Sequence, residues 1–222
     1  MESLEIKNLY NIEQTIAKKY FEKEKYPWEL LAKINKIIIE IGENLDPTKD
    51  DKKEENIWIA KSAKIENYVT IKGPAIIDEN AEIRHCAYIR GNVIIGKNVV
   101  VGNSTEIKNS ILFNNSQVPH FNYVGDSILG YKSHLGAGSI TSNLKSDQTN
   151  VSIKLPNGEK IDTNLRKFGS MLGDYVQIGC NTVLNPGTII EKNSNVYSGC
   201  SVRGVIPENC IYKDKNNIIE KI

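Results

Sequence analysis

The sequence predicts an all-β solenoid, a parallel β-helix of hexapeptide repeats, preceded by a short α-helical segment. Two coupled columns of side chains predict this fold: an aliphatic residue recurs at every sixth position, and a small or branched residue follows each one four positions later. The aliphatic column is Ile59, Ile65, Ile71, Ile77, Ile83, Ile89, Ile95, Val101 and Ile107, and its companion is Ala63, Val69, Ala75, Ala81, Ala87, Val93, Val99, Thr105 and Ile111.

Each repeat unit provides one short strand and one corner, because side chains two positions apart on a strand point to the same face. Three such units close a coil of about 18 residues, with the aliphatic side chains stacked inside a triangular prism. The pattern continues through Val118, Val124, Leu129 and Leu135 with two shorter steps, and it resumes from Leu172 to Val202. We expect the β-helix to span 57–212, followed by a C-terminal tail at 213–222.

Residues 143–171 interrupt the repeat and are expected to leave the solenoid at one corner. Within them, residues 151–163 alternate in polarity around Asn157-Gly158, which predicts a β-hairpin. Long ordered insertions in compact folds often carry function, so this segment is a candidate site.

The segment 1–56 lacks the repeat. Asn11 to Gln14 resembles a helix-capping box before a Lys/Glu-rich helical stretch. Pro27 is suited to the start of a second helix, on which Leu31, Ile34, Ile38 and Ile41 share an apolar face. Residues 46–56 resemble a charged linker. We expect the helical pair to cover the open end of the solenoid, since terminal repeats need covering.

Composition excludes several classes of protein. The 28 basic and 27 acidic residues nearly cancel, which argues against a nucleic-acid binder that relies on a large basic field. No apolar run approaches the ~18 residues that span a bilayer, and the N-terminus lacks a signal-peptide pattern. We therefore expect a cytoplasmic protein without membrane partners. Cysteines 86, 180, 200 and 210 show no metal-ligand spacing, so we expect reduced thiols and no metal.

One outward column is basic. Lys72, Arg90 and Lys108 each follow an inward aliphatic residue at intervals of one coil, so they stack on successive coils. Like charges at the strand spacing of about 4.8 Å repel each other unless an anion or an acidic neighbour offsets them. A solvated face with splayed lysines is the alternative. We favour an anion site, because arginine suits planar phosphate recognition.

The repeat slips around residues 118–126, where His120 lies. Histidine is the natural general base near neutral pH, although a lone histidine at a solenoid corner is more often a surface or capping residue. The run Gly136 to Ser139 offers backbone N–H groups to an oxyanion, or else forms a tight corner.

Three segments carry a resemblance to a known family. Residues 102–110, 118–126 and 135–143 resemble the acetyltransferase domain of bifunctional glucosamine-1-phosphate acetyltransferase/N-acetylglucosamine-1-phosphate uridylyltransferases, which are related to UDP-N-acetylglucosamine pyrophosphorylases. Residues 167–187 look closer to archaeal-type sugar-phosphate nucleotidylyltransferases with the same C-terminal domain. The resemblance covers about residues 57–212 and implies a left-handed β-helix and a homotrimer with sites between prisms.

The resemblance also implies acetyl transfer from acetyl-CoA to the amine of an amino-sugar 1-phosphate. His120 matches the general base, and Asn143 is a further candidate catalytic group. Substrate-binding positions match Arg90, Lys108, Tyr123 and His134, and acetyl-CoA-binding positions match Ala137, Asn143, Leu144, Lys167, Cys180 and Ser198.

The sequence departs from the family pattern in three places. His134 stands where the bacterial enzymes have Asn, and Cys180 where they have Ser. The archaeal relatives carry lysines just after the matched Asn143, whereas Lys145 and Lys154 are out of register. Lys167 matches a family lysine only if the loop is treated as an insertion.

Two functions remain open from the sequence. The first is an N-acetyltransferase for glucosamine- or galactosamine-1-phosphate in UDP-N-acetylhexosamine synthesis. The second is a non-catalytic sugar-nucleotide-binding regulatory subunit that docks on a separate nucleotidylyltransferase. The segment 1–56, which precedes the predicted prism, contains no glycine-rich nucleotide loop, so we expect this chain alone not to form a sugar nucleotide.

Overall fold

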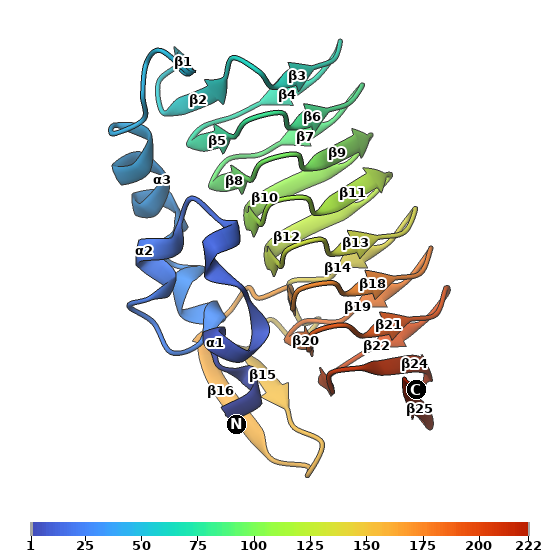
Figure 1. Ribbon diagram of the computed structural model, residues 1–222. Coiled ribbons are helices and arrows are strands. Elements are labelled where there is room, and N and C mark those ends of the chain that lie inside the picture. Colours follow the sequence, from blue (N-terminus) through green and yellow to red (C-terminus); the bar gives the residue numbers. More distant parts are fainter. Residues whose placement is uncertain (1, 222) are drawn as a thin grey trace.

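A left-handed parallel β-helix of triangular section forms most of the computed structural model, which describes residues 2–221 (Figure 1). Each coil gives one strand to each of three faces, and strands of successive coils pair in parallel. In the early coils Ala75 pairs with Val93, 18 residues later. In the middle of the solenoid Ile107 pairs with Val124, only 17 residues later. The predicted fold class is therefore confirmed.

The strands are named here by the face they occupy. The first face contains β2 (Ile57–Ala60), β5 (Ala75–Ile77), β8 (Val93–Ile95), β17 (Ser170–Leu172), β20 (Thr188–Ile190) and β23 (Val205–Ile206). The second contains β4 (Thr70–Ile71), β7 (Tyr88–Ile89), β14 (Ile140–Thr141), β19 (Val183–Leu184) and β22 (Ser201–Val202). Strands β10 (Glu106–Leu112) and β12 (Tyr123–Leu129) run through both of these faces.

The third face contains β3 (Lys64–Ile65), β6 (Glu82–Ile83), β9 (Val100–Asn103), β11 (Gln117–His120), β13 (His134–Leu135), β18 (Gln177–Ile178), β21 (Asn195–Val196) and β24 (Cys210–Asp214). Antiparallel strands extend both ends of the solenoid. Strand β1 (Asp50–Glu54) pairs with β2, and β25 (Asn217–Glu220) pairs with β24. The expected linker and tail thus each contain a strand.

The predicted aliphatic column fills the prism. Its members from Ile77 to Ile107 are fully buried, as are Leu172, Leu184 and Ile190 after the insertion. Ile65, on the first coil, is 39% exposed, because no earlier coil covers it on the third face of the described chain. The prediction is wrong at one position of the companion column. Ser110, and not Ile111, pairs with Val93, and Ile111 points outward.

This slip has a local cause. Strands β10 and β12 extend across the corner between the second and first faces, and this corner uses one residue fewer than in neighbouring coils, which makes these coils shorter. Asn109 and Asp126 turn the chain at this corner with φ of 45° and 48°. Asn and Asp tolerate this left-handed region better than other residues with a Cβ.

The N-terminal segment consists of short helices and 3-10 turns. These are η1 (Glu2–Leu4), α1 (Ile6–Leu9), η2 (Ile12–Gln14), α2 (Lys18–Phe21), η3 (Pro27–Leu30) and α3 (Ile34–Gly42). Asn11 caps η2 by accepting a hydrogen bond from the Glu13 N–H at 3.2 Å, but the Lys/Glu-rich stretch forms only the single turn α2. Leu31, Ile34, Ile38 and Ile41 are buried as predicted.

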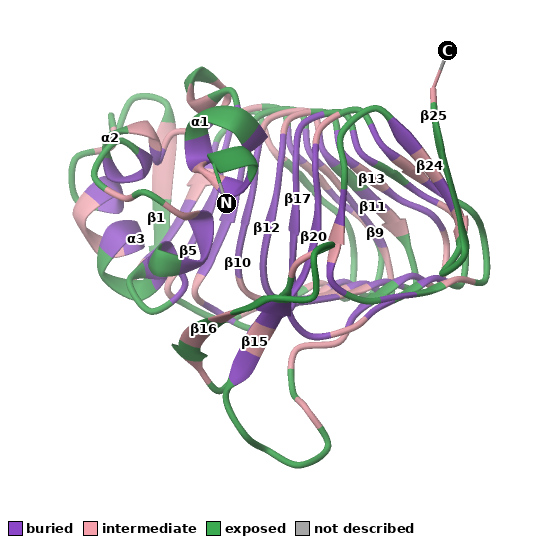
Figure 2. Cartoon of the chain, turned by 90° about the horizontal axis from the view of Figure 1, so that it is seen from below, coloured by how far each residue is buried: buried purple, intermediate pink, exposed green. Residues whose placement is uncertain are grey.

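The prediction that the N-terminal helices cover the open end of the solenoid is wrong, because this segment lies along the side of the prism. Residues 9–11 contact the coil of β17, and α3 lies against β5, β8 and β10 (Figures 1 and 2). The cause is a column of apolar side chains that point outward from the middle of the first-face strands. This outward column is Trp58, Ile76, Ile94, Ile111, Ile128, Met171 and Ile189, and all of them pack in one cluster with the helices.

Asp174 fastens the start of the segment to the solenoid. Its buried carboxylate accepts hydrogen bonds from the backbone N–H groups of Asn11 (2.6 Å) and Tyr131 (2.8 Å). Its own N–H donates to the Leu9 carbonyl. Burial raises the pKa of Asp174 above its ordinary 3.8, against the lowering effect of these two N–H donors.

Residues 143–169 leave the solenoid after β14 and return at β17. They form the hairpin of β15 (Val151–Lys154) and β16 (Lys160–Leu165), with Gly158 at φ 89° in its turn. Val151 and Ile153 are buried against the outside of the solenoid, whereas β16 is largely exposed (Figure 2).

Within residues 2–221, no helix is long and apolar enough to cross a membrane. The same residues contain no group of three His, Cys, Asp or Glu side chains arranged to hold a metal ion.

We predict that Asp174→Ala lowers the free energy of unfolding by about 1–3 kcal/mol for each N–H left without an acceptor. Asp174→Asn, which keeps an acceptor oxygen, should cost less. Between pH 3.8 and the raised folded pKa, the folded protein holds more protons than the unfolded chain, so this carboxyl's stabilising contribution falls as pH rises. Denaturant unfolding of wild type and Asp174→Asn across this range should show the difference between them shrinking with pH. A constant difference would contradict the assignment.

Candidate functional site

The basic column borders a hollow of about 380 Å³ at the corner between the first and second faces. Arg90 and Lys108 lie on one side of it, and the backbone region of Leu31 and Ala32, from the N-terminal segment, lies on the other. The Asn109 side chain donates to the Leu31 carbonyl at 3.3 Å. The side-packed N-terminal segment therefore forms one wall of this hollow.

Carboxylates offset two of the three stacked cations. The Arg90 guanidinium pairs with Glu106 at 2.6 Å, and this hydrogen bond raises the pKa of Arg90. Lys108 pairs with Asp126 at 3.1 Å. Lys72 is exposed, with its ammonium 5.5 Å from the centre of the Tyr88 ring. An anion that enters the hollow must therefore compete with the protein's own carboxylates for Arg90 and Lys108.

Asp126 is the centre of a polar network that joins three coils. It accepts a hydrogen bond from Asn109 at 2.9 Å and another from the Asn143 amide, in addition to its pairing with Lys108. The Asn143 amide also donates to the Tyr123 hydroxyl at 3.2 Å. Burial, followed by the charge of Asp126, raises the pKa of Tyr123. Because Asp126 and Tyr123 occupy the N–H donors of the Asn143 amide, the Asn143 side chain in this arrangement offers no donor to an oxyanion.

His120 lies at the opposite edge of the second face. It ends β11, five positions before Gly125, which pairs with Lys108. At about 3.3 Å per residue, the backbones of His120 and Gly125 are at most ~16 Å apart. His120 is exposed, and its backbone is fixed by Asn122, whose buried side chain accepts from the His120 N–H and donates to two carbonyls of the next coil.

Three of the predicted acetyl-CoA positions stack with His120 along this edge. Successive coils are joined by backbone N–H donors: Gly138 donates to His120, Asn181 to Ala137, and Gly199 to Cys180. Ser198 completes the stack, because the pairing of Ile178 with Val196 places it in register with Cys180. His120, Ala137, Cys180 and Ser198 thus form one exposed edge, which we call the histidine edge. The opposite group of Arg90, Lys108, Tyr123, Asp126 and Asn143 is called the cation edge.

The remaining predicted residues lie on either side of these groups. His134 is half-buried on the third face, and burial, with a smaller contribution from the charge of His120, lowers its pKa. Leu144 and Lys167 are exposed and form an isolated antiparallel bridge at the base of the insertion, next to Asn143.

Chemically, the two edges are complementary. The cation edge can hold a phosphate group and hydroxyls, and the histidine edge can accept a proton. Sequence reasoning missed Asp126, Asn109 and Asn122. The shorter steps of the repeat mark the corners that place Asp126 and Asn109, whereas no periodic signal marks Asn122.

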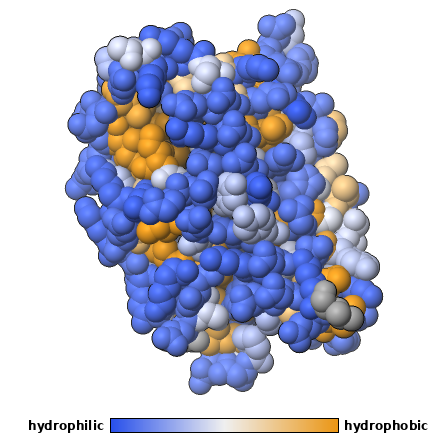
Figure 3. Space-filling model, in the orientation of Figure 1, coloured by the Kyte–Doolittle hydropathy of each residue, from blue (hydrophilic) through white to orange (hydrophobic). Residues whose placement is uncertain are grey.

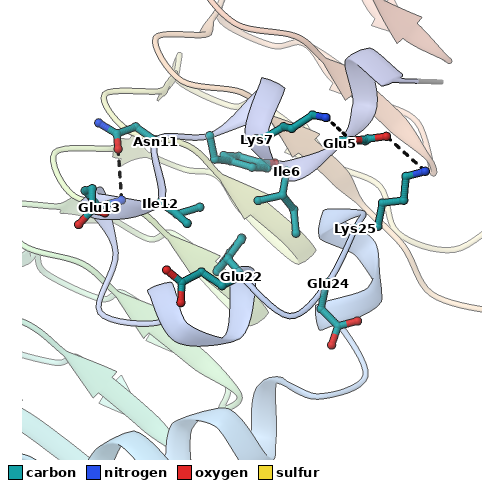
Figure 4. Close-up of a pocket in the computed structure, with 11 residues that line it drawn as sticks. Glu5, Ile6, Lys7, Asn11, Ile12, Glu13, Glu22, Glu24 and Lys25 are labelled. Carbon is teal, nitrogen blue, oxygen red and sulfur yellow. Dashed lines mark hydrogen bonds and ion pairs between the residues drawn. The ribbon is translucent and has the colours of Figure 1, made fainter.

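A separate hollow of about 410 Å³ lies within the N-terminal segment (Figure 4). Its floor includes Tyr10, whose hydroxyl is buried without a partner among the described residues. The charges that line it have ion-pair partners: Glu5 pairs with Lys7 (3.0 Å) and Lys25 (3.3 Å), and the other lining carboxylates pair with lysines outside the hollow. The predicted site residues are not among the described residues that line it.

Comparison with known proteins supplies the family context. Residues 71–192 match the family described as the GMPPB C-terminal domain. The bifunctional protein GlmU of Methanococcus vannielii is 36% identical over 98% of this chain and 52% of its own length. A bifunctional sugar-1-phosphate nucleotidylyltransferase/acetyltransferase of Sulfurisphaera tokodaii is 31% identical over 62% of this chain and 39% of its own. The chain spans about half the length of the curated relatives that match nearly all of it.

Among solved structures, the UDP-N-acetylglucosamine acyltransferase of Francisella novicida matches with a TM-score of 0.48 and 17% identity. The match covers 73% of this chain and 64% of that one. A similarity this distant says nothing about function.

We predict that Asp126→Asn strengthens binding of inorganic phosphate at the cation edge at least fivefold, because the carboxylate no longer competes for Lys108. Even an exposed ion pair contributes up to about 1 kcal/mol, and this pair is largely buried. Asn tolerates the φ of 48° at this position. Calorimetric titration with inorganic phosphate measures the change, and adding Lys108→Gln should remove the gain. Equal phosphate affinity in wild type and Asp126→Asn would show that Asp126 does not mask Lys108.

Proposed function

Because the chain belongs to the GMPPB C-terminal domain family and is an acetyltransferase-type β-helix domain like that of GlmU-like bifunctional proteins, we propose that it is an acetyl-CoA-dependent N-acetyltransferase. Its acceptor would be an amino-sugar 1-phosphate, either glucosamine-1-phosphate or galactosamine-1-phosphate.

One observation carries this proposal: a histidine and a phosphate-suited cation pair lie on the two edges of a single face. Of the residues that the sequence assigned to acetyl-CoA, Ala137, Cys180 and Ser198 follow the histidine edge, whereas Asn143, Leu144 and Lys167 lie at or beside the cation edge. Of those assigned to the sugar phosphate, Arg90, Lys108 and Tyr123 follow the cation edge, and His134 lies on the third face. A proton acceptor, a thioester and a phosphorylated amine are the components that N-acetylation needs.

In the proposed reaction, the acceptor's phosphate binds Arg90 and Lys108 and displaces their carboxylate partners. His120 takes a proton from the amine as its nitrogen attacks the thioester carbonyl. The N–C bond forms, the C–S bond breaks, and the thiolate leaves and is protonated to the free thiol. The backbone N–H of Ala137, which has no acceptor among the described residues, would stabilise the oxyanion, since the Asn143 side-chain donors and the N–H groups of Gly136 and Gly138 are occupied.

We further propose a homotrimer. The two edges of one chain are separated by the width of the second face, and no described contact joins His120 to Lys108. A neighbouring copy that places its histidine edge against this chain's cation edge would bring the general base to the phosphate-bound acceptor.

A second candidate is a sugar-nucleotide-binding subunit without catalysis, which would dock on a separate nucleotidylyltransferase. The pairing of Arg90 and Lys108 with their own carboxylates, and the lack of a described contact between His120 and the cation edge, favour it. This candidate requires sugar-nucleotide binding without acetyl-CoA binding, so calorimetric titration with both ligands distinguishes the two functions.

We predict that His120→Ala lowers turnover at least ~100-fold, the usual contribution of a general base. Thiol release from acetyl-CoA, measured separately with glucosamine-1-phosphate and galactosamine-1-phosphate, would also identify the sugar. His85→Ala is the matched control, since His85 is an exposed histidine in the same column as His120 but two coils earlier, outside the four residues of the histidine edge. Wild-type turnover by the His120 variant would exclude the mechanism. No thiol release by the folded wild-type protein with either sugar would favour the binding subunit.

We predict that Arg90→Ala raises the KM for the sugar phosphate about tenfold with little change in kcat, because the guanidinium would bind the phosphate equally before and during reaction. Arg84→Ala is the control, since Arg84 forms a comparable ion pair with Glu82 at 2.7 Å on the third face, two coils before His120 and outside the residues of both edges. An unchanged KM for Arg90→Ala would remove Arg90 from the acceptor site.

A further inference from the structure

A second basic hollow, of about 200 Å³, lies where the hairpin docks on the solenoid. Four cationic side chains line it: Lys145 from the start of the insertion, Lys154 and Lys160 from the hairpin, and Arg203 from the solenoid corner. None of the described residues that line it carries a carboxylate. We call it the hairpin pocket.

Two glycines fix the hairpin at this corner. Gly187 and Gly204 occupy successive coils with φ of 78° and 88°, a conformation that favours glycine. A Cβ on Gly187 would lie 2.8 Å from a Val151 methyl, and one on Gly204 would lie 2.9 Å from the Lys154 carbonyl oxygen. The hairpin backbone therefore rests directly on the solenoid, which holds Lys154 beside Arg203.

The charges of the hairpin pocket are poorly offset. Lys154 and Lys160 are directly opposite in the hairpin register, an arrangement of like charges that destabilises a strand pair. Within residues 2–221, neither of these lysines nor Arg203 forms an ion pair, and only Lys145 has a carboxylate partner, Asp147 at 3.3 Å. Asp162 lies on the same hairpin face, opposite Ser152, but does not line the pocket.

The cation edge shows the contrast. There, Arg90 and Lys108 each have a carboxylate within 3.1 Å, so that corner is neutralised by the protein itself. In the hairpin pocket, four cations converge, and the described chain places a single carboxylate beside one of them. Repulsion of this kind is relieved when an anion binds.

We propose that the hairpin pocket binds the phosphate group of a phosphorylated small molecule. Lysine and arginine donors suit phosphate oxygens, and guanidinium can contact two of them at once. Pockets that enclose whole ligands of drug size measure roughly 300–1,000 Å³. A hollow of about 200 Å³ therefore fits a phosphate end, while the remainder of the ligand lies outside.

The location separates this site from the acceptor hollow. Arg203 belongs to the same outward column as Lys108, through the paired positions Gly125, Ser142 and Asn185. Four coil steps of about 4.8 Å place it ~19 Å along the same corner. The phosphate could come from the CoA moiety of the acyl donor, which rests on the proposed function, or from a separate phosphorylated metabolite, which does not.

The test is calorimetric titration of the full chain with inorganic pyrophosphate. We expect Lys154→Gln/Lys160→Gln to weaken binding about tenfold or more, and Arg203→Gln to weaken it in the same direction. Lys49→Gln/Lys64→Gln is the matched control, because both lysines are exposed, form no ion pair within residues 2–221, and lie at the far end of the solenoid. Lys108→Gln controls for pyrophosphate binding at the cation edge. Circular dichroism confirms that each variant is folded.

Titration with CoA and dephospho-CoA then separates the two sources. A parallel loss of CoA affinity in the Lys154/Lys160 variant supports the pocket as a site for the acyl donor's phosphates. Unchanged CoA affinity, together with lost pyrophosphate affinity, supports a separate phosphorylated ligand, whatever the result for His120→Ala. Pyrophosphate affinity that is equal in wild type and in Lys154→Gln/Lys160→Gln, or no binding by wild type, overturns the proposal.

Discussion

The arrangement of the whole molecule depends on the apolar side chains that point outward from the first face. A solenoid strand needs apolar residues only on its inner side, yet nearly every first-face strand is apolar at its central, outward position as well. Burial of these side chains is worth on the order of 1.5–3 kcal/mol each. This gain holds the N-terminal segment along the side of the prism and places Gly42 directly against the Trp58 ring, where no Cβ would fit. The surface seen in Figure 3 is mainly hydrophilic, with small separate apolar patches.

Side packing has consequences for chemistry, because it brings the N-terminal segment to the corner where the solenoid shortens. At that corner the shortened coils place Asn109 and Asp126 in left-handed conformations and direct polar side chains toward Leu31. The hollow between them is therefore built from three parts of the chain: the helical segment at Leu31 and Ala32, the coil turn at residues 90–92, and the shortened coils that carry Lys108, Asn109 and Asp126. Its cations Arg90 and Lys108 pair with Glu106 and Asp126, so the proposed phosphate binding there would be an exchange of partners.

The insertion adds a different kind of surface to the same corner. Its hairpin contributes two buried apolar side chains, Val151 and Ile153, to the packed cluster and two lysines to the hairpin pocket. One corner thus has a neutralised cation group near its middle and, further along, a group of four cations of which only Lys145 has a carboxylate partner among the described residues. The histidine edge lies across the second face, which suits a ligand or a neighbouring copy that spans both edges.

The sequence by itself determined the β-helix, its core columns, the two short steps and the hairpin, because each depends on side chains that repeat or alternate at short range. It also identified His120, Arg90 and Lys108 as a group through resemblance. Only the tertiary structure decided where the N-terminal segment packs, that Ile111 points outward, and that Asp126 pairs with Lys108. The tertiary structure also decided that Lys154 lies beside Arg203.

These features join residues that lie a coil or more apart along the chain, and their geometry depends on how many residues each corner uses and on which outward faces are apolar. A hexapeptide repeat specifies the inside of the coil, whereas contacts between coils and with the appended segments arise only once the chain is folded.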